Sequence, residues 1–144
     1  MAYRSILAAY DGSEQAIRAL NTAMQLALEW NAALTVVHAY QIPVPVMGEV
    51  LVTPSADTAA ALSREADNTA EEVKSIIAAV PGLQAEVETM HGEPSRCILE
   101  AAKEKGADLI VIGSRGHGGL KEFVLGSVSH YVTQHARTAV LVVK

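Results

Sequence analysis

Cysteine and aromatic residues are scarce in this sequence. The chain has one cysteine in 144 residues, which excludes an intramolecular disulfide and a zinc site built from several cysteines. Aromatic residues make up 4% of the chain although 50% of it is hydrophobic, so aliphatic side chains must build the core. A single cysteine also fits a protein that works in a reducing compartment.

Positive charge and long apolar runs are missing as well. The formal net charge is -5 and no run of Lys and Arg is present, which argues against binding to duplex nucleic acid. No segment approaches the ~18–20 apolar residues of a membrane span. The opening residues, MAYRSILAAYDG, lack the apolar region of a secretory signal. We therefore expect a cytoplasmic protein that contacts neither nucleic acid nor membrane.

Short apolar strands alternate regularly with helices along the chain. The apolar runs predict strands at residues 5–10, 33–40, 83–90, 107–113 and 138–144. Helical spacing and capping signals predict helices within 11–30, at 58–79, within 91–106 and at 126–136, and either Asp11 or Ser13 can cap the first of them. Such alternation is typical of a Rossmann-like α/β fold, and we predict a five-stranded parallel sheet of order 3-2-1-4-5 with helices on both faces. The length is that of one domain, covering residues 1–144.

The segment 41–57 differs in character from the rest of the chain. It contains Pro43, Pro45 and Pro54 together with Gly48, a composition that argues against a regular element. Such a long connection is unusual in a compact domain, and loops of this kind often act as lids or partner surfaces. We therefore expect segment 41–57 to act as a lid or as a surface for a partner.

Half of the glycine is concentrated in one stretch, GSRGHGGLKEFVLGSVSH, at residues 113–130. In a sheet of order 3-2-1-4-5, this stretch and the turn Asp11-Gly12-Ser13 meet where the strand order reverses, which is where such sheets bind ligands. Glycine lets the backbone N–H groups approach a ligand closely, and the helix that opens near Ser127 adds a positive end. Arg115 and Lys121 add cationic side chains. The stretch is therefore either a phosphate cradle or a flexible turn capped by Ser127.

The glycine spacing distinguishes between known phosphate-binding loops. Neither GxxxxGK[ST] nor GxGxxG is present. The spacing Gly113-x2-Gly116-x9-Gly126-Ser127 resembles the signature of the ATP-binding subgroup of the universal stress protein family. The segments ILAAYDGSEQA, LTVVHAY, HGEP, VIGSRGHGGLKEFVLGSVSHYV and TAVLVVK are also similar to that family. The resemblance covers nearly the whole chain, and is least in 41–57.

The resemblance implies an adenine nucleotide alpha hydrolase-like fold that binds ATP, with the metal, Mg²⁺ or another, left open. Asp11 would lie near the ribose and the phosphates, and it can act as a helix cap at the same time. The backbone of Ala39 would contact adenine, and Ile112 and Gly113 would flank the nucleotide. The positions that match phosphate-binding ones are Gly116, Gly126, Ser127 and Val128, while Arg115 lies inside the motif at a variable position.

The family resemblance also implies a function. It is that of a nucleotide-dependent regulator in a stress response, with at most slow ATPase activity and an unspecified protein partner. Family members form homodimers through the last strand, here 138–143, and we expect charged substitutions at Val140 and Val142 to disturb that contact. The alternative is a homodimeric interaction module that binds no nucleotide. An ATP pyrophosphatase is disfavoured, because YDGSEQ stands where that group has an SGGxDS-type loop.

Two isolated residues have plainer interpretations. His38 lies in an apolar strand and shares no metal-ligand spacing with the other histidines, so we predict a packed histidine. Cys97 lies on a short helix and is expected to be inert.

Overall fold

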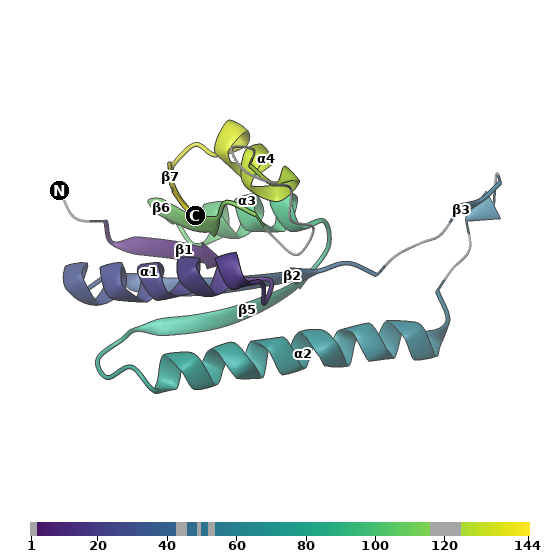
Figure 1. The fold of residues 1–144 in the computed structure, drawn as a ribbon, viewed down its shortest axis with the longest axis horizontal. Helices are drawn as coiled ribbons and strands as arrows, with labels where there is room; N and C mark the ends of the chain where they lie inside the picture. Colours follow the sequence, from purple (N-terminus) through teal and green to yellow (C-terminus); the bar gives the residue numbers. More distant parts are fainter. Residues whose placement is uncertain (1–2, 43–45, 49, 52–53, 116–124) are drawn as a thin grey trace.

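A parallel sheet forms the centre of the molecule (Figure 1). The computed structural model describes residues 3–42, 46–48, 50–51, 54–115 and 125–144. The strands of the sheet are β1 (Ser5–Ala9), β2 (Ala33–Tyr40), β5 (Ala85–His91), β6 (Leu109–Gly113) and β7 (Ala139–Val143). They lie in the order β5-β2-β1-β6-β7, and all four pairings are parallel. This is the 3-2-1-4-5 order expected from the alternation of elements.

Helices cover both faces of the sheet. The helices are α1 (Glu14–Trp30), α2 (Ala56–Ala78), α3 (Pro94–Glu104) and α4 (Ser127–His135). Buried residues of α1 and α2 pack with one face of β1 and β2, and those of α3 and α4 pack with the other. Within the described part of the chain, no helix is both long and apolar enough to cross a membrane.

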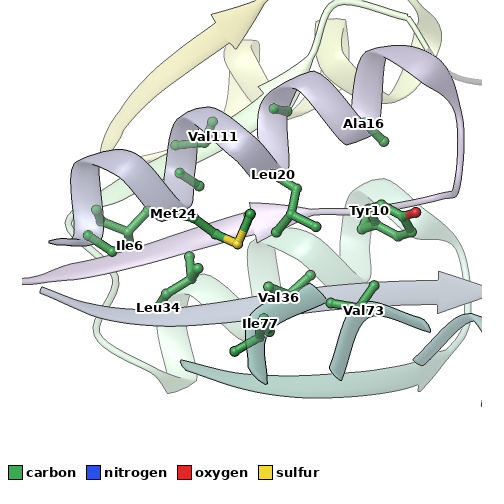
Figure 2. Close-up of a cluster of buried hydrophobic side chains, with 14 of the residues drawn as sticks. Ile6, Tyr10, Ala16, Leu20, Met24, Leu34, Val36, Val73, Ile77 and Val111 are labelled. Carbon is green, nitrogen blue, oxygen red and sulfur yellow. The ribbon is translucent and has the colours of Figure 1, made fainter. Parts of the chain in front are cut away.

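The core is built from aliphatic side chains, as the composition requires. Figure 2 shows Leu20 and Met24 of α1 directed toward Leu34 and Val36 of β2 in one cluster. The helix also buries a row of small residues against the sheet, namely Ala16, Ala19, Ala23 and Ala27. Because alanine adds little bulk, this row allows α1 to lie close to the strands.

The start of α1 is fixed by a side-chain cap. The Oγ atom of Ser13 accepts a hydrogen bond from the N–H of Ala16 at 3.2 Å, so Ser13 is the N-cap. The helix ends at Asn31, whose φ of 52° is left-handed. Between the two expected capping residues, Asp11 and Ser13, the structure selects Ser13 as the cap itself.

Segment 41–57 contains regular structure that the sequence argued against. Strands β3 (Val46–Met47) and β4 (Val50–Leu51) pair antiparallel as a small hairpin. The expectation of an irregular loop is wrong for these residues, because the prolines lie outside the two strands and Gly48 supplies a turn with a φ of 65°. Figure 1 shows β3 away from the main sheet, beyond the end of α2.

β7 lies at one edge of the sheet. It pairs with β6 from Leu109 and Ala139 to Gly113 and Val143. Val140 and Val142 pack against the cluster beneath α3 and α4, so charge at these positions would disturb the core as well as the edge. Leu141 is 37% exposed and is therefore a better probe of any contact made by this strand.

The buried face of α1 can be tested by a matched pair of substitutions. Leu20→Ala is expected to lower the free energy of unfolding by about 2–5 kcal/mol, because it leaves a cavity. Leu20 is 1% exposed, whereas Ile17 on the same helix is 41% exposed. Ile17→Ala should therefore change stability by less than about 0.5 kcal/mol. Chemical denaturation measures both, and equal losses would contradict this orientation of α1.

Candidate functional site at the reversal of strand order

The strand order reverses between β1 and β6. From β1 the chain continues through β2 to β5 on one side, and it then crosses to β6 on the other. Ile6 lies opposite Leu109 and Ala8 opposite Val111, so the two strands run in register toward the same end of the sheet. The turn after β1 and the glycine stretch after β6 therefore begin side by side, as expected for a ligand site in this fold.

Asp11 is held in the turn that leads from β1 into α1. One carboxylate oxygen of Asp11 accepts a hydrogen bond from the N–H of Ser13 at 2.9 Å, and Gly12 between them has a φ of 82°. Asp11 is exposed to solvent. It thus stabilises the turn beneath the N-cap while its carboxylate lies at the carboxyl end of the sheet.

Tyr10, the last residue before that turn, is buried beneath α2. Burial raises the pKa of its phenol, and the negative charges of Glu72 and Asp11 raise it further. The phenol therefore stays neutral across the physiological range, and Tyr10 contributes packing at the base of the turn.

Gly113 ends β6 where the first turn of α1 comes very close. A Cβ atom at residue 113 would lie 2.9 Å from the Cβ of Gln15 and 3.0 Å from its carbonyl carbon. Neither atom can move without shifting the helix. A glycine is therefore required here by packing, whatever its role toward a ligand.

Ser114 joins the two ends of the glycine stretch. Its carbonyl accepts hydrogen bonds from the N–H of Gly126 at 2.8 Å and from the Oγ of Ser129 at 2.9 Å. Its own N–H donates to the carbonyl of Val143, the last residue of β7, at 2.8 Å. Ser114 is therefore hydrogen-bonded both to the start of α4 and to the end of the edge strand.

Sequence reasoning missed both Ser114 and Ser129. Ser129 is 2% exposed, and its hydroxyl also lies 3.1 Å from the carbonyl of Gly126. The only signal in the sequence was that Ser114 directly follows Gly113 and that Ser129 lies shortly after Gly126. No spacing rule connects a serine after a strand with one inside the next helix.

The N-cap residue of α4 supplies no side-chain cap. That residue is Gly126, with φ -60° and ψ 163° and no capping side chain. The interpretation of Ser127 as the cap is therefore wrong, because Ser127 is already the first helical residue. Because glycine has no side chain, Gly126 offers no side-chain acceptor to the first-turn N–H groups, which lie at the positive end of the helix.

The other expected residues differ in where the structure places them. Ala39 lies on β2, two residues beyond the last residue of β2 that pairs with β1. The side chain of Ile112 is buried in the cluster beneath α3 and α4, so any contact with a ligand would be through its backbone. Arg115 and Val128 are half-buried. Gly116 and Lys121 lie outside the described residues.

The described residues contain no recognisable metal centre. Nowhere among them are three or more His, Cys, Asp or Glu side chains grouped so that they could hold an ion. His38 is a packed histidine, as expected. Burial raises the pKa of the Cys97 thiol, as do Glu100 and Glu93, which keeps it protonated and unreactive.

Comparison with known proteins gives a consistent result. A model of the universal stress protein family matches residues 2–144. Universal stress protein YxiE from Bacillus subtilis is 42% identical over 154 residues, covering 99% of each chain. Universal stress protein UspA from Lactobacillus plantarum superimposes with a TM-score of 0.83 at 25% identity, covering 100% of this chain and 99% of that one. A universal stress protein in complex with cAMP gives a TM-score of 0.75 at 27% identity, with coverage of 100% and 99%.

The packing requirement at Gly113 leads to a direct test. Gly113→Ala is expected to lower the free energy of unfolding by about 1–3 kcal/mol, because the added methyl group meets the backbone of Gln15. Ser127→Ala, at an exposed position of the same stretch, should change stability by less than about 0.5 kcal/mol. Thermal and chemical unfolding measure both. An unaltered stability of Gly113→Ala would show that α1 is free to move away.

Proposed function

Since the chain belongs to the universal stress protein family, we propose that it binds ATP at the reversal of strand order and acts as a nucleotide-dependent regulator in a stress response. Occupancy of the site, rather than turnover, would be the signal that a partner protein reads. Any hydrolysis would be slow, because it requires an oriented water and a metal ion on the phosphates.

The observation that carries this proposal is the N-terminus of α4. As the N-cap, Gly126 brings no side-chain acceptor to the first turn of that helix, at the end of the sheet where such folds bind ligands. N–H groups at the positive end of a helix suit a phosphate group. In this proposal Gly126, Ser127 and Val128 bind the phosphates, together with Gly116 and Arg115.

The other half of the nucleotide would lie toward β1 and β2. Asp11 is exposed beside the end of β1 and would contact the ribose, or a Mg²⁺ ion held by the phosphates. The backbone of Ala39 would contact the base, and the backbones of Ile112 and Gly113 would line the site between the two halves. The relative bound to cAMP supports an adenine nucleotide as the class of ligand.

We further propose that the chain forms a homodimer through β7, residues 138–143. The two edges of the sheet differ in a way that favours this strand. At the β5 edge, Lys105 lies 2.8 Å from Glu86 and 3.6 Å from Glu88, and the hydrogen bond from Lys105 lowers the pKa of Glu86. Charged edges discourage strand pairing, whereas β7 reads AVLVV and carries the exposed Leu141.

The phosphate site is tested by substituting the cap residue. ATP with Mg²⁺ at about 100 times its dissociation constant should stabilise nucleotide-free wild type by about 2.7 kcal/mol in a thermal melt. Gly126→Asp should remove this gain while leaving the free protein at least as stable, because aspartate caps the helix and repels phosphate. Melts with AMP and cAMP identify the preferred nucleotide.

Gly126→Asn is the matched control, since asparagine caps the helix without adding charge. Weak binding in both variants would mean that the N–H groups contact the phosphates, and weak binding in the aspartate variant alone would mean that only the charge matters. If neither variant changed the ATP effect, or if wild type showed none, the phosphate site would be refuted. The interaction module without nucleotide would then be the better interpretation.

The dimer is tested by its mass in solution. Light scattering should give a dimer for wild type and a monomer for Leu141→Lys, because a charge at the paired edge opposes association. Ile17→Lys places the same charge on an exposed position of α1 and should leave the dimer intact. A monomeric wild type, or a dimer that survives Leu141→Lys, would contradict the β7 interface.

A further inference from the structure

The pairing of β1 with β2 ends in a hydrogen bond from a side chain, where a regular ladder would have one from the main chain. The N–H of Tyr10 donates to the carbonyl of Val37 at 2.9 Å, which continues the parallel ladder. In a regular ladder, the carbonyl of Tyr10 would next accept from the N–H of Ala39. Instead, the Nδ1 atom of His38 lies 2.9 Å from that carbonyl, and the strand register ends at Ala9 and Val37.

The partner in this contact shows which nitrogen of the His38 ring carries a hydrogen. A carbonyl oxygen only accepts hydrogen bonds, so Nδ1 of His38 must carry the hydrogen. His38 is 9% exposed and Tyr10 3% exposed, so the hydrogen bond lies in the interior. Losing a buried hydrogen bond leaves an unpaired carbonyl and is costly. The ring is therefore a specific partner for the last carbonyl of β1.

The early end of the β1–β2 ladder affects the backbone groups of Ala39. Alternate residues of a parallel strand direct both their N–H and their C=O toward the same neighbour. Because Val37 faces β1 in this way, Ala39 directs its two groups to the same side, where β1 has already turned away at Asp11. On the opposite side, β2 stays paired with β5 as far as Tyr40 and His91, so this edge of β2 is held in place.

An adjacent N–H and C=O form a small recognition edge for a nucleobase. Adenine presents a donor, its N6 amino group, beside a ring nitrogen acceptor. We propose that His38 is a positioning residue for base recognition: by bonding the Tyr10 carbonyl, it stops the ladder one step early and keeps the backbone of Ala39 available to the base. This inference rests on the proposed nucleotide function and names the residue that prepares its base subsite.

Two variants separate the donor from the rest of the ring. The side-chain nitrogen of His38→Asn can occupy the position of Nδ1 and keep the bond, whereas His38→Leu fills the space without a donor. In the leucine variant, the Tyr10 carbonyl is expected to take the N–H of Ala39, which extends the ladder. His38→Gln, whose nitrogen reaches the Nε2 position, replaces the leucine variant if that protein does not fold.

The first measurement compares binding of ATP with that of tripolyphosphate, which lacks the base and ribose. His38→Leu should weaken ATP binding about tenfold or more, equivalent to about 1.4 kcal/mol, and leave tripolyphosphate binding unchanged. His38→Asn should bind ATP within about threefold of wild type, a difference of less than 1 kcal/mol. Equal weakening of both ligands would indicate a general structural role and overturn the proposal, as would wild-type ATP affinity in His38→Leu.

The second measurement does not depend on nucleotide. Amide hydrogen exchange at Ala39 should be fast in free wild type and in His38→Asn, and slow in His38→Leu, where the ladder closes. A slow Ala39 amide in wild type would overturn the proposal. If wild type binds no ATP, the proposed function fails and base recognition fails with it, while the exchange rates still decide whether His38 holds the ladder open.

Discussion

The candidate site depends on the unequal lengths of two neighbouring strands. β1 ends at Ala9, while β2 continues to Tyr40 and remains paired with β5 over that extension. Because a parallel sheet satisfies its backbone groups only where strands overlap, the shorter strand leaves an edge of its neighbour open at the carboxyl end of the sheet. The turn containing Asp11 begins at the same place. The base and ribose halves of the proposed site thus follow from where one strand stops.

Close packing of α1 sets the shape of the other half. The alanine row of this helix lets it lie near the sheet, and its first turn then reaches Gly113 at the end of β6. The glycine that opens the motif is consequently fixed by a contact with Gln15, which is distant in sequence. A ligand that approaches the backbone closely would impose the same requirement, and the two explanations are separable by stability measurements.

Ser114 connects three parts of the molecule through its backbone. Its N–H bonds the end of β7, and its carbonyl bonds both Gly126 and Ser129 of the α4 terminus. The proposed phosphate site and the edge strand are therefore one hydrogen-bond step apart. A change in the position of the α4 terminus would reach Val143 through Ser114, so the same residue lies between the proposed nucleotide site and the proposed dimer edge.

The sequence alone determined the class of fold and indicated the region of the candidate site. Alternating apolar strands and helices predicted the order 3-2-1-4-5, and the glycine spacing near residues 113–127 indicated a phosphate-binding motif. These signals are local, because hydrophobic periodicity and turn residues are expressed within a few neighbouring positions. The position of Ser13 as a helix cap was readable for the same reason.

Only the tertiary structure decided which residues support that site. The bond between His38 and Tyr10, the contact of Gly113 with Gln15 and the link between Ser114 and Gly126 each join segments that are separate in sequence. The hairpin at 46–51 and the glycine cap of α4 also differ from expectation, since both depend on backbone geometry rather than composition. Long-range hydrogen bonds and close approaches arise only when the strands are assembled, so no local pattern can encode them.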